Sequence, residues 1–260
     1  MLEDELMSFK LQSIKEEVTQ LNEQVYKKCS VAYLNKYVAC PIIDEDKSMF
    51  LYGLLKQSKY PHLQSAYIAV MLVDLALSLH EAVPINNEHE GDVKHRQLTV
   101  LGGDYYSSLY YNELAKIDDL NLIKNVARAI QEINEQKMNV YLQRSDVLED
   151  YLKGIEKINA YLFASIANEL KCPEWSQFVA SFFLLKVLIM QRNNIIDVKV
   201  GHKKMIDQNK ENIDVKIKDL TKKVMILLQS NLTLHQLFSD SFKELQKYEN
   251  RLVNATGEGL

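Results

Sequence analysis

The sequence predicts an all-α protein, a bundle of about nine helices in a single domain. Apolar residues recur at three- and four-residue spacing along almost the whole chain, as on the buried side of amphipathic helices. Only 8 Gly and 4 Pro interrupt the 260 residues, which favours long helices over many short strands. The chain has no internal repeat and no Pro- or Ser-rich linker. We therefore expect one domain over residues 1–253 and a flexible tail at 254–260.

The expected helices follow one another with short connections. The first begins near Leu6 and runs toward Tyr37, and Cys40-Pro41 ends it because the residue before a proline disfavours the helical conformation. Pro61 and Pro173 suit the first turns of the third and seventh helices, where an N–H is unpaired anyway. The other helices are expected over 46–57, 61–82, 95–116, 119–142, 145–170, 173–194, 205–229 and 232–252.

Composition and charge argue against several classes of protein. A formal net charge of -4 provides no basic field for nucleic acid, and no Lys/Arg block alternates with aromatic residues. The acidic N-terminus lacks a signal-peptide pattern, and Asp74 or Lys186 interrupts the most apolar stretches. We therefore expect no nucleic-acid partner, no transmembrane segment and a cytoplasmic location. Cys29, Cys40 and Cys172 are widely spaced, which predicts reduced, mostly buried thiols rather than a metal site.

The helix expected at 61–82 is apolar nearly all round, so it should lie in the middle of the bundle. Asp74, Ser78 and Glu81 share one stripe of this helix because they follow i, i+4, i+7 spacing. A buried carboxylate is costly unless it is paired or faces water. The three residues therefore line a water-filled cavity or form a polar stripe that is hydrogen-bonded to a neighbouring helix.

The segment 96–111 is the most unusual in the chain. Gly102 and Gly103 each cost on the order of 1 kcal/mol relative to alanine in a helix, which predicts the close approach of another backbone. Gly103 and Ser107 lie one turn apart, and Tyr106 and Tyr110 form an aromatic strip beside them. Tyrosine is enriched both in cores and at interfaces, so these residues indicate either core packing or a subunit interface.

Two segments in this order resemble motifs of the trans-isoprenyl diphosphate synthases, all-α enzymes that extend an allylic diphosphate by isopentenyl units. The first is Leu79-His80-Glu81-Ala82-Val83-Pro84-Ile85, where that family has Leu-His-Asp-Asp-x-x-Asp. The second is Val100-Leu101-Gly102-Gly103-Asp104-Tyr105, which is similar to the family's Val-Leu-x-Gly-Asp-Tyr. The resemblance spans most of the chain and implies a helical bundle of the isoprenoid-synthase type.

The chain departs from that family where its carboxylates bind metal. Mg²⁺ prefers hard oxygen ligands, and two Asp-Asp-x-x-Asp motifs supply them in the family. The first motif here reads Glu81, Ala82 and Ile85 at the acidic positions. The second reads Asn193, Asn194 and Asp197, so only two of the six positions remain acidic. Replacing carboxylates by amides or alkyl groups removes the Coulomb attraction for divalent cations.

Two further parts of the family's site are also changed. The loop that carries paired arginines in the family reads Asn86-Asn-Glu-His-Glu-Gly-Asp92 here, an acidic stretch that would repel a diphosphate. The family's Lys-Thr pair is replaced by Ile158 and Asn159, and Lys157 lies one residue early, about 100° away around a helix.

Several separate parts of the family's catalytic site are lost here, while the spacing of the motifs is retained. This pattern is expected of a subunit that does not itself catalyse the reaction. Gly-Asp-Tyr-Tyr-Ser at 103–107, followed by Glu132-Ile-Asn-Glu-Gln-Lys-Met138, resembles the component I family of heptaprenyl diphosphate synthases. This resemblance implies a chain with no catalytic residue and no cofactor of its own. It also implies a heterodimer with a catalytic component II that binds Mg²⁺, and together they would make the C35 chain for menaquinone. The interface is expected at Gly102, Gly103, Tyr106, Ser107 and Tyr110, together with the helix at 119–142.

Two other functions remain as alternatives. The chain could be a self-sufficient prenyl synthase or a terpene-cyclase-like enzyme with an unorthodox site. It could also be a helical interaction module unrelated to prenyl chemistry, which would leave the near-matches of two motifs to chance. Fold resemblance alone does not decide between functions, but the pattern of losses favours the accessory subunit.

Overall fold

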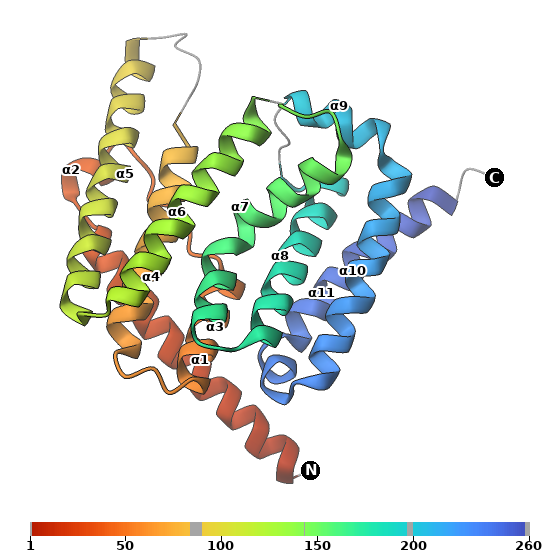
Figure 1. The fold of residues 1–260 in the computed structure, drawn as a ribbon, viewed down its shortest axis with the longest axis horizontal. Helices are drawn as coiled ribbons and strands as arrows, with labels where there is room; N and C mark the ends of the chain where they lie inside the picture. The colour runs from red at the N-terminus through yellow and green to blue at the C-terminus, as the bar shows by residue number, and fades with distance from the viewer. Residues whose placement is uncertain (1, 84–89, 143, 197–199, 258–260) are drawn as a thin grey trace. The chain divides into compact units, whose positions relative to one another are not determined.

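The computed structural model describes residues 2–83, 90–142, 144–196 and 200–257. These residues form eleven helices and no strand, which confirms the all-α prediction (Figure 1). In chain order the helices are α1 (Leu2–Cys29), α2 (Ala32–Asn35), α3 (Glu45–Gln57), α4 (Leu63–Glu81), α5 (Glu90–Ile117), α6 (Leu120–Tyr141), α7 (Leu148–Glu169), α8 (Pro173–Arg192), α9 (Val200–Gln208), α10 (Lys210–Ser230) and α11 (Leu232–Gly257).

The chain groups into two compact units, Met1–Val126 and Ala127–Leu260. The first contains α1 to α5 and the start of α6, and the second contains the rest of α6 and α7 to α11. The expectation of one domain over 1–253 stays a prediction. Where a tail was expected from residue 254, α11 continues to Gly257.

Eleven helices form where about nine were predicted, because two of the expected helices are each broken once. α1 ends at Cys29, and α2 starts only after Val31, whose backbone is extended with φ -124° and ψ 115°. The second break falls at Asn209, between α9 and α10. The Asn209 side-chain amide donates to the carbonyl of Met205 at 2.9 Å, a local bond that competes with continued helix.

α4 is the central helix of the first unit and packs against α1, α3 and α5 (Figure 1). Its eleven buried residues explain why its sequence is apolar nearly all round. α3 begins next to it because the Asp44 side chain accepts hydrogen bonds from the backbone N–H groups of Asp46 and Lys47, at 2.9 and 3.1 Å. The predicted central position of α4 is correct within this unit.

α8 holds the corresponding place in the second unit, where it packs against α7, α10 and α11. Pro173 occupies its first turn, as expected. Phe178 and Phe182 stack with ring centroids 5.2 Å apart, and both contact Phe238 of α11, at 4.8 and 5.5 Å. α8 is therefore held by aromatic packing on the side that faces α11.

Among the described helices, α4 alone is long and apolar enough to cross a membrane by length and composition. Within its most apolar 18-residue window, 61% of the residues are buried in the structure. Core helices of globular proteins have the same character.

Candidate functional site

The two segments that resemble prenyl-synthase motifs meet where α4 packs on α5. The His80 ring lies across Gly103, where a Cβ atom would approach ring atoms to 2.5 Å. Next to it, a Cβ at Gly102 would lie 2.9 Å from Leu79 and 3.2 Å from Leu34. The glycines thus allow α4 and α2 to approach the backbone of α5, as the sequence predicted for a neighbouring element.

Polar atoms at this junction make one weak contact. His80 Nε2 lies 3.8 Å from Asp104 Oδ1, and the side chains are 40% and 66% exposed. An exposed pair at this distance contributes little to stability. Packing of His80 on Gly103, rather than charge, therefore joins the two segments.

The first motif does not gather carboxylates in the described residues. Glu81 is the last residue of α4 and is exposed, and Ala82 caps the helix with its N–H bonded to the Ser78 and Leu79 carbonyls. Ile85 and the acidic segment 86–89 lie outside the described residues. Only one carboxylate of this motif is in view, too few for a Mg²⁺ site.

Asp74, the first residue of the polar stripe on α4, forms an ion pair with α3. Lys47 Nζ donates to Asp74 Oδ1 at 2.7 Å, and both side chains are largely buried, at 17% and 14% exposure. Ser78 donates to the Asp74 carbonyl at 2.8 Å. The charge of Asp74 is therefore compensated by a neighbouring helix, which was the second of the two expected arrangements. A cavity-lining role for Asp74, Ser78 and Glu81 stays a prediction.

The second motif forms the C-terminal cap of α8. Asn194 has left-handed backbone, with φ 54°, as asparagine tolerates at this position. Its N–H donates to the Gln191 carbonyl at 3.1 Å, and Ile195 N–H donates to Met190 at 2.9 Å. This pair of bonds is the Schellman arrangement, which satisfies the last carbonyls of a helix.

The Asn193 side chain is committed to the backbone. Its amide nitrogen donates to the Ile189 carbonyl at 2.9 Å and to the Tyr248 carbonyl of α11 at 3.4 Å. A carboxylate cannot donate these bonds, so the amide at this position holds α8 to α11.

The residues present do not fit the Mg²⁺ cluster of the synthase family. At the first two positions of the second motif, where that family has aspartates, this chain directs the Asn193 N–H₂ group at two carbonyls and turns the backbone at Asn194 into a helix cap. Among the described residues no three His, Cys, Asp or Glu side chains gather closely enough to hold a metal. Asp197 lies outside the described residues.

Residues at and next to the positions of the family's Lys-Thr pair make hydrogen bonds that stabilise the fold. Asn159 donates to the Ile155 carbonyl at 2.8 Å. Lys157 Nζ donates to Glu132 of α6 at 2.6 Å, and this contact lowers the pKa of the Glu132 carboxyl against the opposing effect of burial. Lys157 thus ties α7 to α6 within the second unit.

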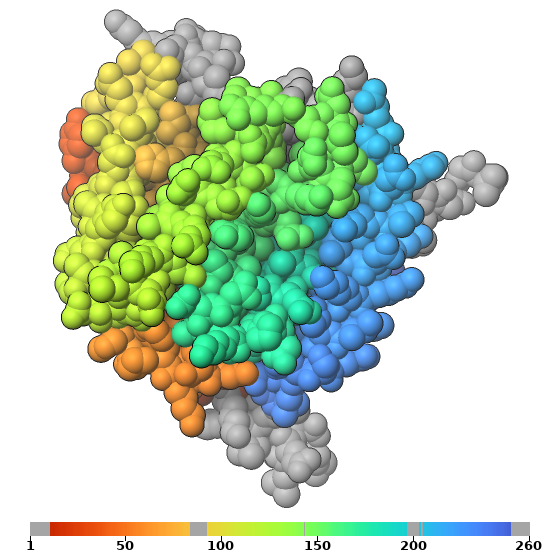
Figure 2. Space-filling model, in the orientation of Figure 1, coloured from red at the N-terminus to blue at the C-terminus, as the bar shows by residue number. Residues whose placement is uncertain are grey.

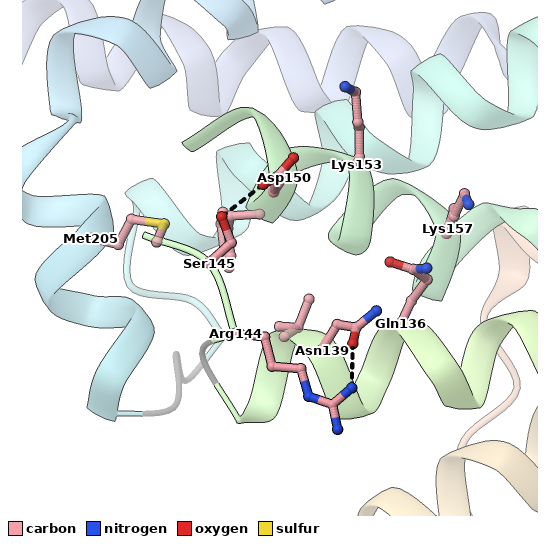
Figure 3. Close-up of a pocket in the computed structure, with 10 residues that line it drawn as sticks. Gln136, Asn139, Arg144, Ser145, Asp150, Lys153, Lys157 and Met205 are labelled. Carbon is pink, nitrogen blue, oxygen red and sulfur yellow. Dashed lines mark hydrogen bonds between the residues drawn. The ribbon is translucent and has the colours of Figure 1, made fainter. Parts of the chain in front are cut away.

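A cavity of about 300 Å³ lies between the end of α6, the start of α7 and α9 (Figure 3). Ser145 donates to Asp150 at 2.7 Å, and Arg144 donates to Asn139 at 3.1 Å on opposite sides of it. Lys153 points away from these groups (Figure 3). Four of its polar side chains are therefore paired with one another.

The expected interface residues are mostly core residues of the first unit. Gly102 and Gly103 pack under α4, while Tyr106 and Tyr110 are only 1% and 6% exposed. Ser107 is half-buried between them. Gly102, Gly103, Tyr106 and Tyr110 are thus packed within the first unit, which is the first of the two expected roles, and a subunit interface at these residues stays a prediction.

A different stripe of α5 is exposed. Val100, Leu101 and Tyr111 are 39%, 59% and 59% exposed, and Asp104 and Ser108 lie between them at helical spacing. We call these five residues the outer stripe of α5. α5 is visible in yellow at the surface in Figure 2.

One cluster was missed by the sequence analysis. Tyr106 Oη of α5 donates to Cys40 Sγ at 3.3 Å. Nothing in the sequence signals this contact, because the two residues are 66 positions apart and Cys40 lies in an irregular segment.

Solved structures with this fold are all-α prenyl synthases. The decaprenyl diphosphate synthase of Rhodobacter capsulatus superposes with a TM-score of 0.65 at 13% identity, covering 94% of this chain and 99% of that one. The geranylgeranyl pyrophosphate synthase of Corynebacterium glutamicum, solved with calcium and isoprenyl diphosphate, gives 0.62 at 14% identity over 95% and 96%. At such identities the likeness shows the fold alone. The chain therefore has the fold of the prenyl synthases.

The family follows from sequence comparison. A family model described as heptaprenyl diphosphate synthase (HEPPP synthase) subunit 1 matches residues 31–249, and the chain belongs to this family. Heptaprenyl diphosphate synthase component 1 of Geobacillus stearothermophilus is 34% identical over 155 residues, which are 60% of this chain and 68% of that protein.

Proposed function

We propose that the chain is the non-catalytic subunit of a two-component heptaprenyl diphosphate synthase. It works beside a catalytic component that has intact aspartate-rich motifs and binds Mg²⁺, and the pair elongates farnesyl diphosphate with isopentenyl diphosphate to the C35 product. The chain itself holds no cofactor. We further propose that the pair acts in the cytoplasm and that its product enters menaquinone biosynthesis.

The observation that carries the proposal is the use of Asn193. Prenyl transfer begins with ionisation of an allylic diphosphate, which requires Mg²⁺ held by carboxylates. In this chain the first position of the second motif clamps α8 to α11 through N–H donors. Asn193 therefore stabilises the fold instead of binding Mg²⁺. We expect the catalytic partner to supply the carboxylates that bind the metal.

We propose the outer stripe of α5 as the surface that contacts the partner. Leu101 and Tyr111 are large apolar side chains exposed on one helix face, and such residues anchor interfaces when a partner buries them. An interface of ordinary size would bury on the order of 1,600 Å² in total.

The test is reconstitution of activity from separate components. The purified chain, a purified synthase with intact aspartate-rich motifs from the same organism, and their mixture are each incubated with farnesyl diphosphate, isopentenyl diphosphate and Mg²⁺. We expect C35 product from the mixture only. Prenyl transfer by this chain alone would overturn the non-catalytic role, and full C35 synthesis by the other component alone would overturn the need for a second subunit.

A further inference from the structure

The turn between α10 and α11 exposes three large apolar side chains. Met225 and Ile226, near the end of α10, are 40% and 60% exposed, and Leu232, the first residue of α11, is 69% exposed. Only Asn231 separates the two helices, so the three residues lie at one end of a helical hairpin (Figure 1). We call Met225, Ile226 and Leu232 the hairpin tip.

The residues around the hairpin tip are fixed in the core of the second unit. Leu228, Leu234 and Phe238 are 4%, 0% and 0% exposed, and Phe238 packs against the two stacked rings of α8. The Asn231 side chain caps α11, because its oxygen accepts a hydrogen bond from the Leu234 N–H at 3.0 Å. The buried positions of the hairpin are therefore already filled, and the hairpin tip is held at the surface.

The charges near the hairpin tip are mostly positive. From Val224 to Ser239 the chain contains no Asp, Glu, Lys or Arg. Directly before this stretch, α10 carries three exposed lysines, at 218, 222 and 223, and one exposed acid, Asp219. Lys222 lies one helical turn from both Met225 and Ile226, so its ammonium group flanks the apolar side chains.

We propose that the hairpin tip docks on the surface of a lipid bilayer that contains anionic lipids. The three apolar side chains enter the boundary between headgroups and acyl chains, while Lys218 and Lys222 contact headgroup phosphates. A free phosphate would account for the lysines but not for the apolar residues beside them. Because only three side chains insert, the contact is peripheral and reversible.

The first experiment mixes the full chain with dense vesicles of phosphatidylcholine, with or without phosphatidylglycerol, and sediments them. We expect the chain in the pellet with the anionic vesicles only, and less of it at high salt, because salt screens the lysines. Lys222→Gln should weaken binding about five-fold. The matched control is Lys243→Gln on α11, an exposed lysine that lies 3.4 Å from Asp240, and it should bind as the parent does.

A second set of variants tests the apolar side chains. Ile226→Ser and Leu232→Ser should each weaken vesicle binding about ten-fold, because each removes apolar area that would leave water. Val215→Ser is the control, at a position 58% exposed on the same helix about three turns earlier, and it should have no effect. Ile226→Trp provides a direct signal, since its emission should shift to the blue with anionic vesicles while the fully buried Trp175 does not respond.

Three results would overturn the proposal. They are no sedimentation with anionic vesicles, equal binding to both kinds of vesicle, and equal losses from Val215→Ser and Ile226→Ser. Impaired C35 synthesis by Ile226→Ser without any vesicle binding by the parent would make the hairpin tip a protein contact instead. The vesicle experiments use this chain alone and no prenyl substrate, so their outcome leaves the proposed function untouched.

Discussion

His80 of α4 lies across Gly103 of α5, close enough that a Cβ atom at residue 103 would come within 2.5 Å of its ring. The contact joins the end of the first altered motif to the Gly-Asp-Tyr segment, two parts of the sequence that share a resemblance to prenyl synthases. It also explains a glycine in the middle of a helix, where alanine would otherwise be preferred.

Gly103→Ala should destabilise the protein by about 1–2 kcal/mol, because the overlap with His80 outweighs the better helix propensity of alanine. The matched change Gly102→Ala should be close to neutral, since its nearest neighbour would be 2.9 Å away at a flexible leucine end. Urea unfolding of both variants measures the difference. Adding His80→Ala to Gly103→Ala should recover most of the loss; additive effects of the two changes would contradict the contact.

Asn193→Asp should cost about 1–3 kcal/mol, because it removes two N–H donors and places a carboxylate against two carbonyls. Thermal unfolding should show the loss with and without Mg²⁺, and the variant should gain no prenyl transfer. The control is Asn194→Asp at the neighbouring, exposed position, where the left-handed backbone also tolerates aspartate. Stabilisation of Asn193→Asp by Mg²⁺ would mean that the motif can still assemble a metal site.

Because of Glu113, the free energy of unfolding should depend on pH in the acidic range. It is 5% exposed, and although burial opposes its charge, bonds of 2.8 Å from Lys116 and Lys28 lower its pKa below the ordinary 4.5. The resulting stabilisation is fully present above pH 4.5 and is lost as the pH falls through the lowered pKa. Glu113→Gln should therefore be less stable than the parent by about 1–2 kcal/mol at pH 7, and this gap should narrow at pH 3. A gap of the same size at both pH values would show that charge is not the cause.

Tyr106→Phe should weaken the Cys40 thiolate while keeping the ring that fills the core. Alkylation of Cys40 by iodoacetamide should rise with pH around a midpoint near 6 in the parent chain. Loss of one hydrogen bond of ordinary strength should slow the reaction about five-fold at pH 5.5 in the variant, with its midpoint moved upward. Alkylation of Cys172 in the same sample gives the reference rate. An unchanged Cys40 profile would exclude the tyrosine hydroxyl as a donor.

Leu101→Arg should break the complex with the catalytic component without unfolding the chain, because this side chain is 59% exposed on the outer stripe of α5. Loss of a hot-spot side chain costs about 2 kcal/mol or more, which weakens binding roughly thirty-fold. Ile226→Arg on α10 is the matched control, an equally exposed apolar residue at 60% on the other unit. Co-purification with the catalytic component and C35 synthesis by the mixture are measured for both variants. Binding lost with Ile226→Arg and kept with Leu101→Arg would move the interface to α10.

The helices themselves were largely predictable. The ends of α3, α6 and α8 lie within two residues of the expected limits, because periodicity and caps are local properties of the sequence. The breaks at residues 30–31 and 209 were not predicted. Apolar periodicity continues across both, and only the extended backbone of Val31 and the side-chain bond of Asn209 interrupt the helix.

The altered motifs could also be found from the sequence, but the use of their residues could not. Replacement of carboxylates at 82, 85, 193 and 194 is visible in the sequence alone. That Asn193 donates to the Tyr248 carbonyl, 55 residues further on, depends on how α11 returns to α8. The sequence left two roles open for the glycines and tyrosines of α5 for a related reason, since small and aromatic residues line several of its faces and periodicity alone does not say which one is buried.

The sequence by itself thus determined the all-α class, the central place of α4 and α8 in their units, and the loss of metal-binding carboxylates, because each depends on residue type and spacing within one segment. Only the tertiary structure decided that Gly103 packs against His80, that the outer stripe of α5 is exposed, and that Tyr106 donates to Cys40. These contacts join segments whose relative positions are set by the path of the chain at helix breaks and loops, and that path is fixed by packing rather than by local preference.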